Sequence, residues 1–238
     1  MPDTRQPGTQ SVGPRPGSPS ALVLVLPGGR AHGHGRAHPL RLAYLRMLPF
    51  ARLLARAGSA HGLEVEMVRY RYQGWNAPAR DALRDTEWAL ERARDRHPHA
   101  PVVLLGHSMG GRAALFAAGH PSVRAVCALA PWLEGDDPVR QLAGRTVLLA
   151  HGDQDRVTDP ERSYAYALRA RQVSDQVCRF DVPGDGHAML RRRRDWNLLV
   201  RRFVLGELGI EPMDPSITNA LRQPVPEGLR AALSGEHP

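Results

Sequence analysis

The fold is decided by one stretch of the chain, Leu104-Leu105-Gly106-His107-Ser108-Met109-Gly110-Gly111. It matches the pattern Gly-x-Ser-x-Gly, with an apolar run before it and a small-residue, helix-compatible segment after it. A strand that turns at once into a helix holds its serine in a strained backbone conformation. Side chains at Gly106 or Gly110 would collide there with the neighbouring strand and helix. The turn presents the Ser108 hydroxyl above the carboxyl end of the sheet, where open α/β sheets build their sites.

Apolar runs alternate with segments of helical periodicity on both sides of this turn. Strands are predicted at residues 21–26, 63–70, 101–105, 123–130, 146–150 and 177–182. Helices are predicted at residues 39–58 (divided near Pro49), 80–97, 109–119, 159–172 and 188–208. This alternation predicts an α/β protein with a doubly wound, mostly parallel sheet of about six strands and helices on both faces.

The periodic part of the chain, residues 21–208, is expected to form one domain. Residues 1–20 are rich in Pro, Gly and Ser and are expected to be a disordered leader. From residue 209 the pattern weakens into Pro-punctuated segments, so residues 209–238 are expected to be a tail that packs on the surface or stays mobile. Only residues 227–233 have a brief helical pattern.

Composition excludes several classes of function. The net charge is +8, but all 32 basic residues are arginines scattered along the chain without interleaved aromatic residues, so nucleic acid is not an expected partner. We recognise no signal peptide and no apolar run long enough to span a bilayer, which predicts a cytoplasmic protein. The two cysteines, Cys127 and Cys178, fall in separate predicted strands and are expected to be buried free thiols. The sequence leaves the oligomeric state open.

A serine hydroxyl is a weak nucleophile until a base takes its proton, so a histidine should lie beside Ser108. Four histidines follow it in the chain: His120, His151, His187 and His237. His187 lies in a glycine-containing loop after a predicted strand and is the preferred base, with His151 second.

The orienting acid should come from the loop between the strand at 146–150 and the next helix. Asp153, Asp155 and Asp159 compete for this role. Asp159 precedes Pro160 and fits a helix N-cap. Asp153 lies close to the strand end, whereas Asp155 lies deeper in the loop and is preferred on reach.

An oxyanion hole needs two N–H donors. One is expected from Met109, the residue after the nucleophile. The other should come from the loop after the first strand, where Gly29 is preferred and Arg30 is the alternative.

The motif at Gly106–Gly111, together with His151-Gly152-Asp153-Gln154-Asp155 and Gly186-His187, resembles the α/β-hydrolase superfamily over roughly residues 21–206. The resemblance implies a compact α/β-hydrolase fold with Ser108, Asp155 and His187 as the triad, and an acyl-enzyme route. Pro27 stands where many members have a histidine. Only residues 131–144 separate two predicted strands at the place where larger members insert a cap, so a minimal lid is expected.

These features predict a serine hydrolase that cleaves an ester, thioester or amide of a small acyl substrate, with no cofactor and no metal. Acyl transfer or other triad chemistry and a catalytically inactive binding protein are the alternatives. The histidine-rich segment 31–38 is interpreted as a flexible loop bordering the site. Trp75 and Trp132 follow strand ends and are candidates for pocket lining or for packing.

Overall fold

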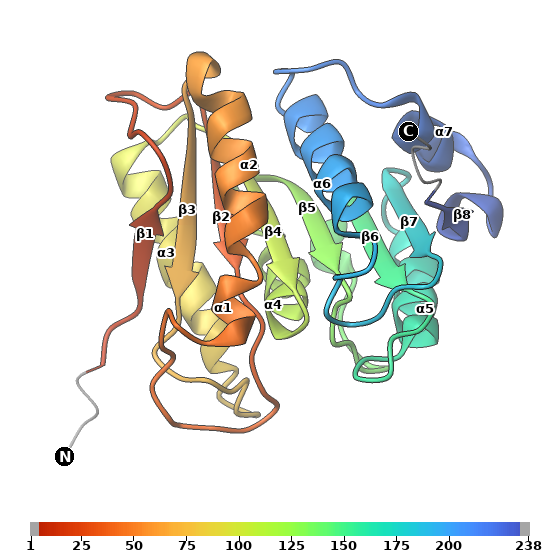
Figure 1. Ribbon diagram of the computed structural model, residues 1–238, viewed down its shortest axis with the longest axis horizontal. Coiled ribbons are helices and arrows are strands. Elements are labelled where there is room, and N and C mark those ends of the chain that lie inside the picture. The colour runs from red at the N-terminus through yellow and green to blue at the C-terminus, as the bar shows by residue number, and fades with distance from the viewer. Residues whose placement is uncertain (1–4, 234–238) are drawn as a thin grey trace.

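A computed structural model describes residues 5–233 of the chain. Its eight strands form one sheet in the order β1-β3-β2-β4-β5-β6-β7-β8 (Figure 1). All neighbouring pairs are parallel except β1 and β3. The strand bounds are β1 Gly8–Ser11, β2 Ala21–Leu26, β3 Leu63–Arg69, β4 Val102–His107, β5 Val123–Leu129, β6 Thr146–Gly152, β7 Val177–Val182 and β8 Ala231–Ala232. The predicted doubly wound, mostly parallel α/β fold is confirmed.

Helices cover both faces of the sheet, which explains why its central strands are apolar without alternation. One face packs against α1 (Leu42–Leu45), α2 (Leu48–Gly58) and α6 (Arg193–Glu207), as Figure 1 shows in front of the sheet. The other face packs against α3 (Asp81–Arg96), α4 (Met109–Ala117) and α5 (Pro160–Arg171). Along β2, the valines belong to the first core and the leucines to the second.

The prediction that residues 1–20 are disordered is wrong for residues 8–11, which form β1 and pair antiparallel with β3. An edge strand is stabilised mainly by backbone hydrogen bonds to its neighbour, so the composition of the segment does not predict the strand. The segment also supplies polar partners for two buried carboxylates of β3. Arg15 lies 3.4 Å from Glu64 and 3.7 Å from Glu66. Residues 1–4 of the predicted leader lie outside the described residues.

The tail is folded onto the domain where the structure describes it. It forms α7 (Pro215–Arg222), the 3-10 turn Glu227–Leu229 and β8, which lies parallel to β7. Two arginines of the domain hold it: Arg171 donates to the carbonyls of Leu221 and Gln223, and Arg179 donates to that of Leu229. With β1 and β8 the sheet has eight strands, two more than predicted. Residues 234–238 of the predicted tail lie outside the described residues.

Smaller features also follow from the local sequence. Pro49 lies in the first turn of α2, so the predicted helix at 39–58 is divided in two. Cys127 and Cys178 are buried free thiols in β5 and β7, as predicted. Between β5 and β6 the chain forms only the 3-10 turn Arg140–Leu142.

Among residues 5–233 there is no helix with the length and apolarity that a bilayer crossing requires.

Candidate active site

Ser108 occupies a strained turn between β4 and α4. Its backbone angles are φ 56° and ψ −121°, a conformation that residues other than glycine rarely adopt. The two glycines of the motif are required by close approach. A Cβ on Gly106 would lie 2.2 Å from the carbonyl oxygen of Gly110, and a Cβ on Gly110 would lie 2.1 Å from that of Leu26. The predicted collisions with the helix and with the neighbouring strand are both present.

The structure brings together the serine, histidine and aspartate preferred from the sequence. The Nε2 atom of His187 lies 3.0 Å from Oγ of Ser108, and its Nδ1 atom lies 2.8 Å from Oδ2 of Asp155. An ionised carboxylate only accepts hydrogen bonds, so Nδ1 carries the proton in the neutral ring. Nε2 is therefore left as the acceptor that faces the serine hydroxyl.

Asp155 is fixed by a set of converging donors. Its Oδ1 accepts hydrogen bonds from the backbone N–H of Val157 and Thr158, and its Oδ2 accepts one from the Thr158 hydroxyl. Burial opposes ionisation of this carboxyl, but the hydrogen bonds from His151, His187 and the two amides outweigh it. They hold the pKa of Asp155 well below its ordinary value, so the group is an anion at neutral pH.

The loop that carries His187 is held at two points by other aspartates. Asp153 accepts the N–H of Gly184 at 2.7 Å, at the start of the loop, and among the described residues the His187 imidazole is hydrogen-bonded to the carboxylate of Asp155 and not to that of Asp153. Asp185 is buried and accepts hydrogen bonds from the backbone N–H of Gly186 and from Nε1 of Trp196. Because this loop runs to residue 192, α6 begins at Arg193 and not at residue 188 as predicted.

His151, the second candidate for the base, contacts the same Asp155 oxygen as His187 and has no hydrogen bond to Ser108 among the described residues. It is fully buried, with Nε2 3.1 Å from Oδ2 of Asp155 and Nδ1 3.0 Å from Oγ of Ser163. The buried Arg179 donates to the same Ser163 oxygen. Burial lowers the pKa of His151, so it acts as a neutral support for the carboxylate. Its spacing of four residues from Asp155 is a signal that could have predicted this contact.

His107 is a second support that the sequence interpretation missed. Its ring centroid lies 4.7 Å from that of His187, and its Nε2 donates to the His187 carbonyl oxygen at 3.0 Å. Burial, followed by the nearby His187, lowers the pKa of His107 to about 3. Its place directly before Ser108, at the end of a buried strand, is the signal that could have identified it.

Two backbone amides are candidates for the oxyanion hole. Arg30 is not available, because its N–H donates to the carbonyl of Gln73 at 2.8 Å. Among the described residues, no backbone hydrogen bond uses the N–H of Gly29 or Met109. A Cβ on Gly29 would lie 2.3 Å from Cε of Met109 and 2.5 Å from the Gln73 carbonyl, so only glycine fits there.

The two tryptophans pack around an arginine. The Arg112 guanidinium lies 4.8 Å from the ring centroid of Trp75 and 4.5 Å from that of Trp132. Arg112 also forms ion pairs with Glu134 and Asp137. These contacts fix α4, the helix that follows the nucleophile, to the loop after β5.

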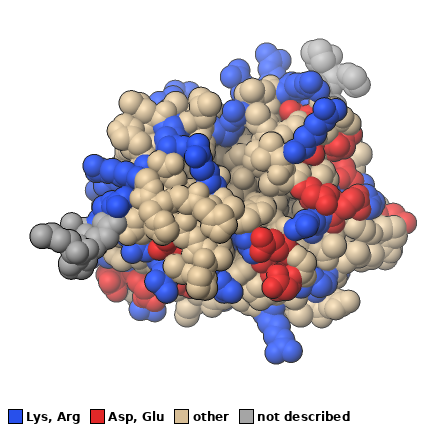
Figure 2. All heavy atoms as spheres, turned by 90° about the horizontal axis from the view of Figure 1, so that it is seen from below, with Lys and Arg blue, Asp and Glu red and all other residues tan. Residues whose placement is uncertain are grey.

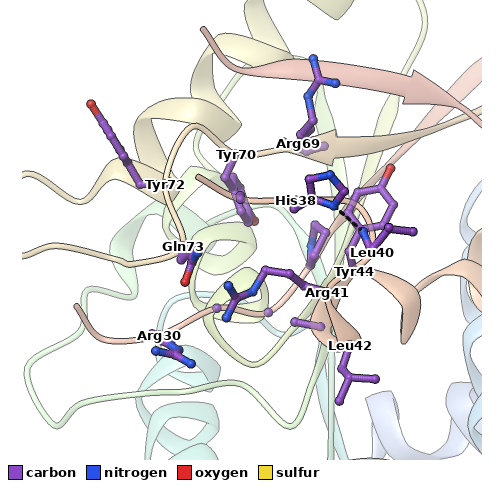
Figure 3. A pocket seen from close by; sticks show the side chains of 16 residues that line it. Arg30, His38, Leu40, Arg41, Leu42, Tyr44, Arg69, Tyr70, Tyr72 and Gln73 are labelled. Carbon is purple, nitrogen blue, oxygen red and sulfur yellow. Dashed lines mark hydrogen bonds between the residues drawn. The ribbon is translucent and has the colours of Figure 1, made fainter. Parts of the chain in front are cut away.

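Two hollows flank the site at the carboxyl end of the sheet, the face that Figure 2 shows. A cavity of about 440 Å³ opens beside the Pro27–Arg30 loop (Figure 3). A smaller hollow of about 210 Å³ lies against Met189 and Leu190, just after His187. Leu42 borders both hollows.

Comparisons with known proteins agree with this fold. A family model described as serine aminopeptidase, S33, matches residues 61–147. No curated protein matches the chain.

Solved structures resemble the chain over most of its length. An α/β serine hydrolase homologue from Coxiella burnetii has a TM-score of 0.64 and 19% identity, covering 86% of this chain and 94% of that one. Est1E from Butyrivibrio proteoclasticus, with ferulic acid bound, has a TM-score of 0.63 and 15% identity, covering 85% and 96%. An α/β serine hydrolase without lid from Xanthomonas campestris has a TM-score of 0.59 and 20% identity, covering 88% and 90%.

Proposed function

Since this chain has the fold of the α/β-hydrolase superfamily, we propose that it is a serine hydrolase acting on an ester, thioester or amide of a small acyl compound. The observation that carries the proposal is the hydrogen-bonded series from Ser108 through His187 to Asp155. In this proposal Ser108 is the nucleophile, His187 the general base and Asp155 the orienting acid.

The reaction has two steps. In the first, Oγ of Ser108 forms a bond to the substrate carbonyl carbon while Nε2 of His187 takes the hydroxyl proton. The bond to the leaving group then breaks, and His187 passes the proton to the departing atom. In the second step, His187 takes a proton from water while the water oxygen attacks the carbonyl carbon of the acyl-enzyme. The acid is released and Ser108 regains its proton.

The negative oxygen formed in each step needs donors that are already in place. We assign this role to the N–H groups of Met109 and Gly29. Among residues 5–233 no backbone hydrogen bond uses either N–H, which supports the assignment, because such donors need no rearrangement when the charge develops. Removal of one such donor typically reduces turnover by about 10²–10³-fold.

Asp155 keeps His187 in the tautomer that can accept the serine proton, and it stabilises the imidazolium that follows. His151 and Thr158 act as positioning residues through Asp155, and His107 acts as one through the backbone of His187.

A panel of 4-nitrophenyl esters of graded acyl length tests the proposal on the wild type and on Ser108→Ala. We expect hydrolysis by the wild type and a loss of at least about 10⁴-fold in kcat for the variant. Hydrolysis that persists in a folded Ser108→Ala protein would contradict the role of Ser108. Adding methanol or an amine to the assay separates hydrolysis from acyl transfer, since a transferase forms the new ester or amide in preference to the free acid.

A further inference from the structure

The larger cavity has a chemical character that identifies the kind of acyl group it fits. It begins at the proposed oxyanion loop, because Pro27, Gly28 and Gly29 form part of its wall. A Cβ on Gly28 would lie 3.3 Å from Cβ of Ser108, so the loop that forms this part of the wall lies against the nucleophile.

Its wall combines apolar surface with positive charge. The apolar part comes from aliphatic and tyrosine side chains, including Leu40, Leu42 and Val68. Among the sixteen described residues that line the cavity, none is Asp or Glu, whereas three are arginines: Arg30, Arg41 and Arg69. The Arg69 side chain points away from the other two in Figure 3. In Figure 3 the Arg41 side chain points across the cavity toward Arg30 and Gln73.

These two arginines have no acidic partner in the part of the chain that the structure describes. Other arginines of the chain do form ion pairs, such as Arg71 with Asp85 and Arg112 with Asp137. Two guanidinium groups beside an apolar cavity are suited to bind a carboxylate, which accepts their hydrogen bonds.

Both arginines are attached to a backbone that is held in place. The N–H of Arg30 donates to Gln73, and its carbonyl accepts from Trp75. The N–H of Arg41 donates to the His38 carbonyl, and the Arg41 carbonyl accepts from the N–H groups of Tyr44 and Leu45, the last two residues of α1. Ligand binding would therefore order only the side chains, which limits its entropic cost.

The position of His187 indicates which part of the substrate enters this cavity. His187 must pass its proton to the leaving atom, so the leaving group lies on its side of Ser108. The smaller hollow, lined by Met189 and Leu190, is on that side. The larger cavity is lined by the oxyanion loop and by no residue of the segment 187–190, so it is left for the acyl part.

We propose that the preferred substrates are esters or thioesters whose short acyl chain ends in a carboxylate, which Arg30 and Arg41 bind. This inference rests on the proposed hydrolase function and specifies its substrate class.

The test compares mono-4-nitrophenyl glutarate with 4-nitrophenyl pentanoate, which have acyl chains of the same length and differ in the terminal carboxylate. We expect kcat/KM of the wild type to favour the glutarate ester by at least about ten-fold, since each charge-assisted hydrogen bond contributes on that scale. Arg41→Gln and Arg30→Gln should each reduce this preference by about ten-fold. Arg52→Gln, an exposed arginine of α2 outside the cavity, is the matched control and should keep it.

The inference would be overturned if the wild type hydrolysed the two esters with nearly equal kcat/KM, or if the preference for the glutarate ester survived both arginine substitutions. Hydrolysis of the pentanoate ester would in either case leave the proposed function standing. A second pair of esters, 4-carboxyphenyl pentanoate and phenyl pentanoate, places the carboxylate on the leaving group instead. If the kcat/KM ratio for this pair exceeded the ratio for the glutarate and pentanoate pair, the bound carboxylate would belong to the leaving group, and the inference would also be overturned. Calorimetric titration with glutarate gives a readout independent of catalysis. Binding that is weakened in Arg30→Gln and Arg41→Gln supports the assignment of these two residues as a carboxylate site, and absence of binding to the wild type contradicts it.

Discussion

The substitution His107→Gln should make the protein less sensitive to acid. His107 is buried against the loop that carries His187, and its folded-state pKa of about 3 lies below the ordinary value of 6.5. Glutamine retains a side-chain N–H that can donate to the His187 carbonyl but does not titrate. The change therefore removes a protonation site with little change in the polar contact.

The size of the effect follows from proton linkage. At pH 5 the unfolded imidazole is almost fully protonated, whereas the folded one stays neutral. Because the pKa is lower in the folded state, its contribution to stability is complete above pH 6.5 and is lost as the pH falls toward 3. Between pH 8 and pH 5 this linkage lowers the free energy of unfolding by about 2 kcal/mol.

Urea unfolding followed by tryptophan fluorescence at pH 8 and pH 5 measures this loss. The wild type should lose about 2 kcal/mol more than His107→Gln over this interval. The exposed His61, replaced in the same way, is the control and should behave as the wild type. If His107→Gln loses as much stability as the wild type between the two pH values, the reasoning from burial is refuted.

Three further substitutions separate the roles of neighbouring residues. Asp155→Asn should reduce kcat/KM by about 10⁴-fold, because it favours the wrong tautomer of the base, whereas Asp153→Asn should retain most of the activity; comparable losses in both variants would contradict the assignment. His151→Leu should lower kcat by about ten-fold with KM unchanged, since it removes one donor to Asp155 and leaves the others; a change confined to KM would be inconsistent with a positioning role. Gly110→Ala places a methyl group 2.1 Å from the Leu26 carbonyl oxygen and should lower the free energy of unfolding by about 1–3 kcal/mol in thermal or urea denaturation; an unchanged melting temperature would show that the turn can relax.

The parts of the fold that could be predicted are those with an apolar pattern. The central strands are buried on both faces, so their sequences are continuous apolar runs, and the helices between them have one apolar side. β1 and β8 have no such pattern because they are edge strands held by backbone pairing. β1 forms because it pairs with β3, and β8 because it pairs with β7. The sequence of either edge strand alone does not contain this information.

The candidate site divides in the same way. Ser108 and its glycines form a local turn, and the turn chemistry alone identifies them. His187 and Asp155 come from separate loops, and the sequence could order the candidates for each but could not show the contact. His151 was identified only as a second candidate for the base, although it contacts Asp155. His107 and Arg179 were missed because each acts through a neighbour in space: His107 on His187, and Arg179 on His151 through Ser163.

The most direct test of the account is the reaction with a fluorophosphonate, which labels only a serine activated by a base. We predict one equivalent of label per chain, located on Ser108 by peptide mass spectrometry, with loss of labelling in Ser108→Ala. Folded wild-type protein that takes up no label, or label that maps to another serine, would contradict the claim that Ser108 is the nucleophile of a serine hydrolase.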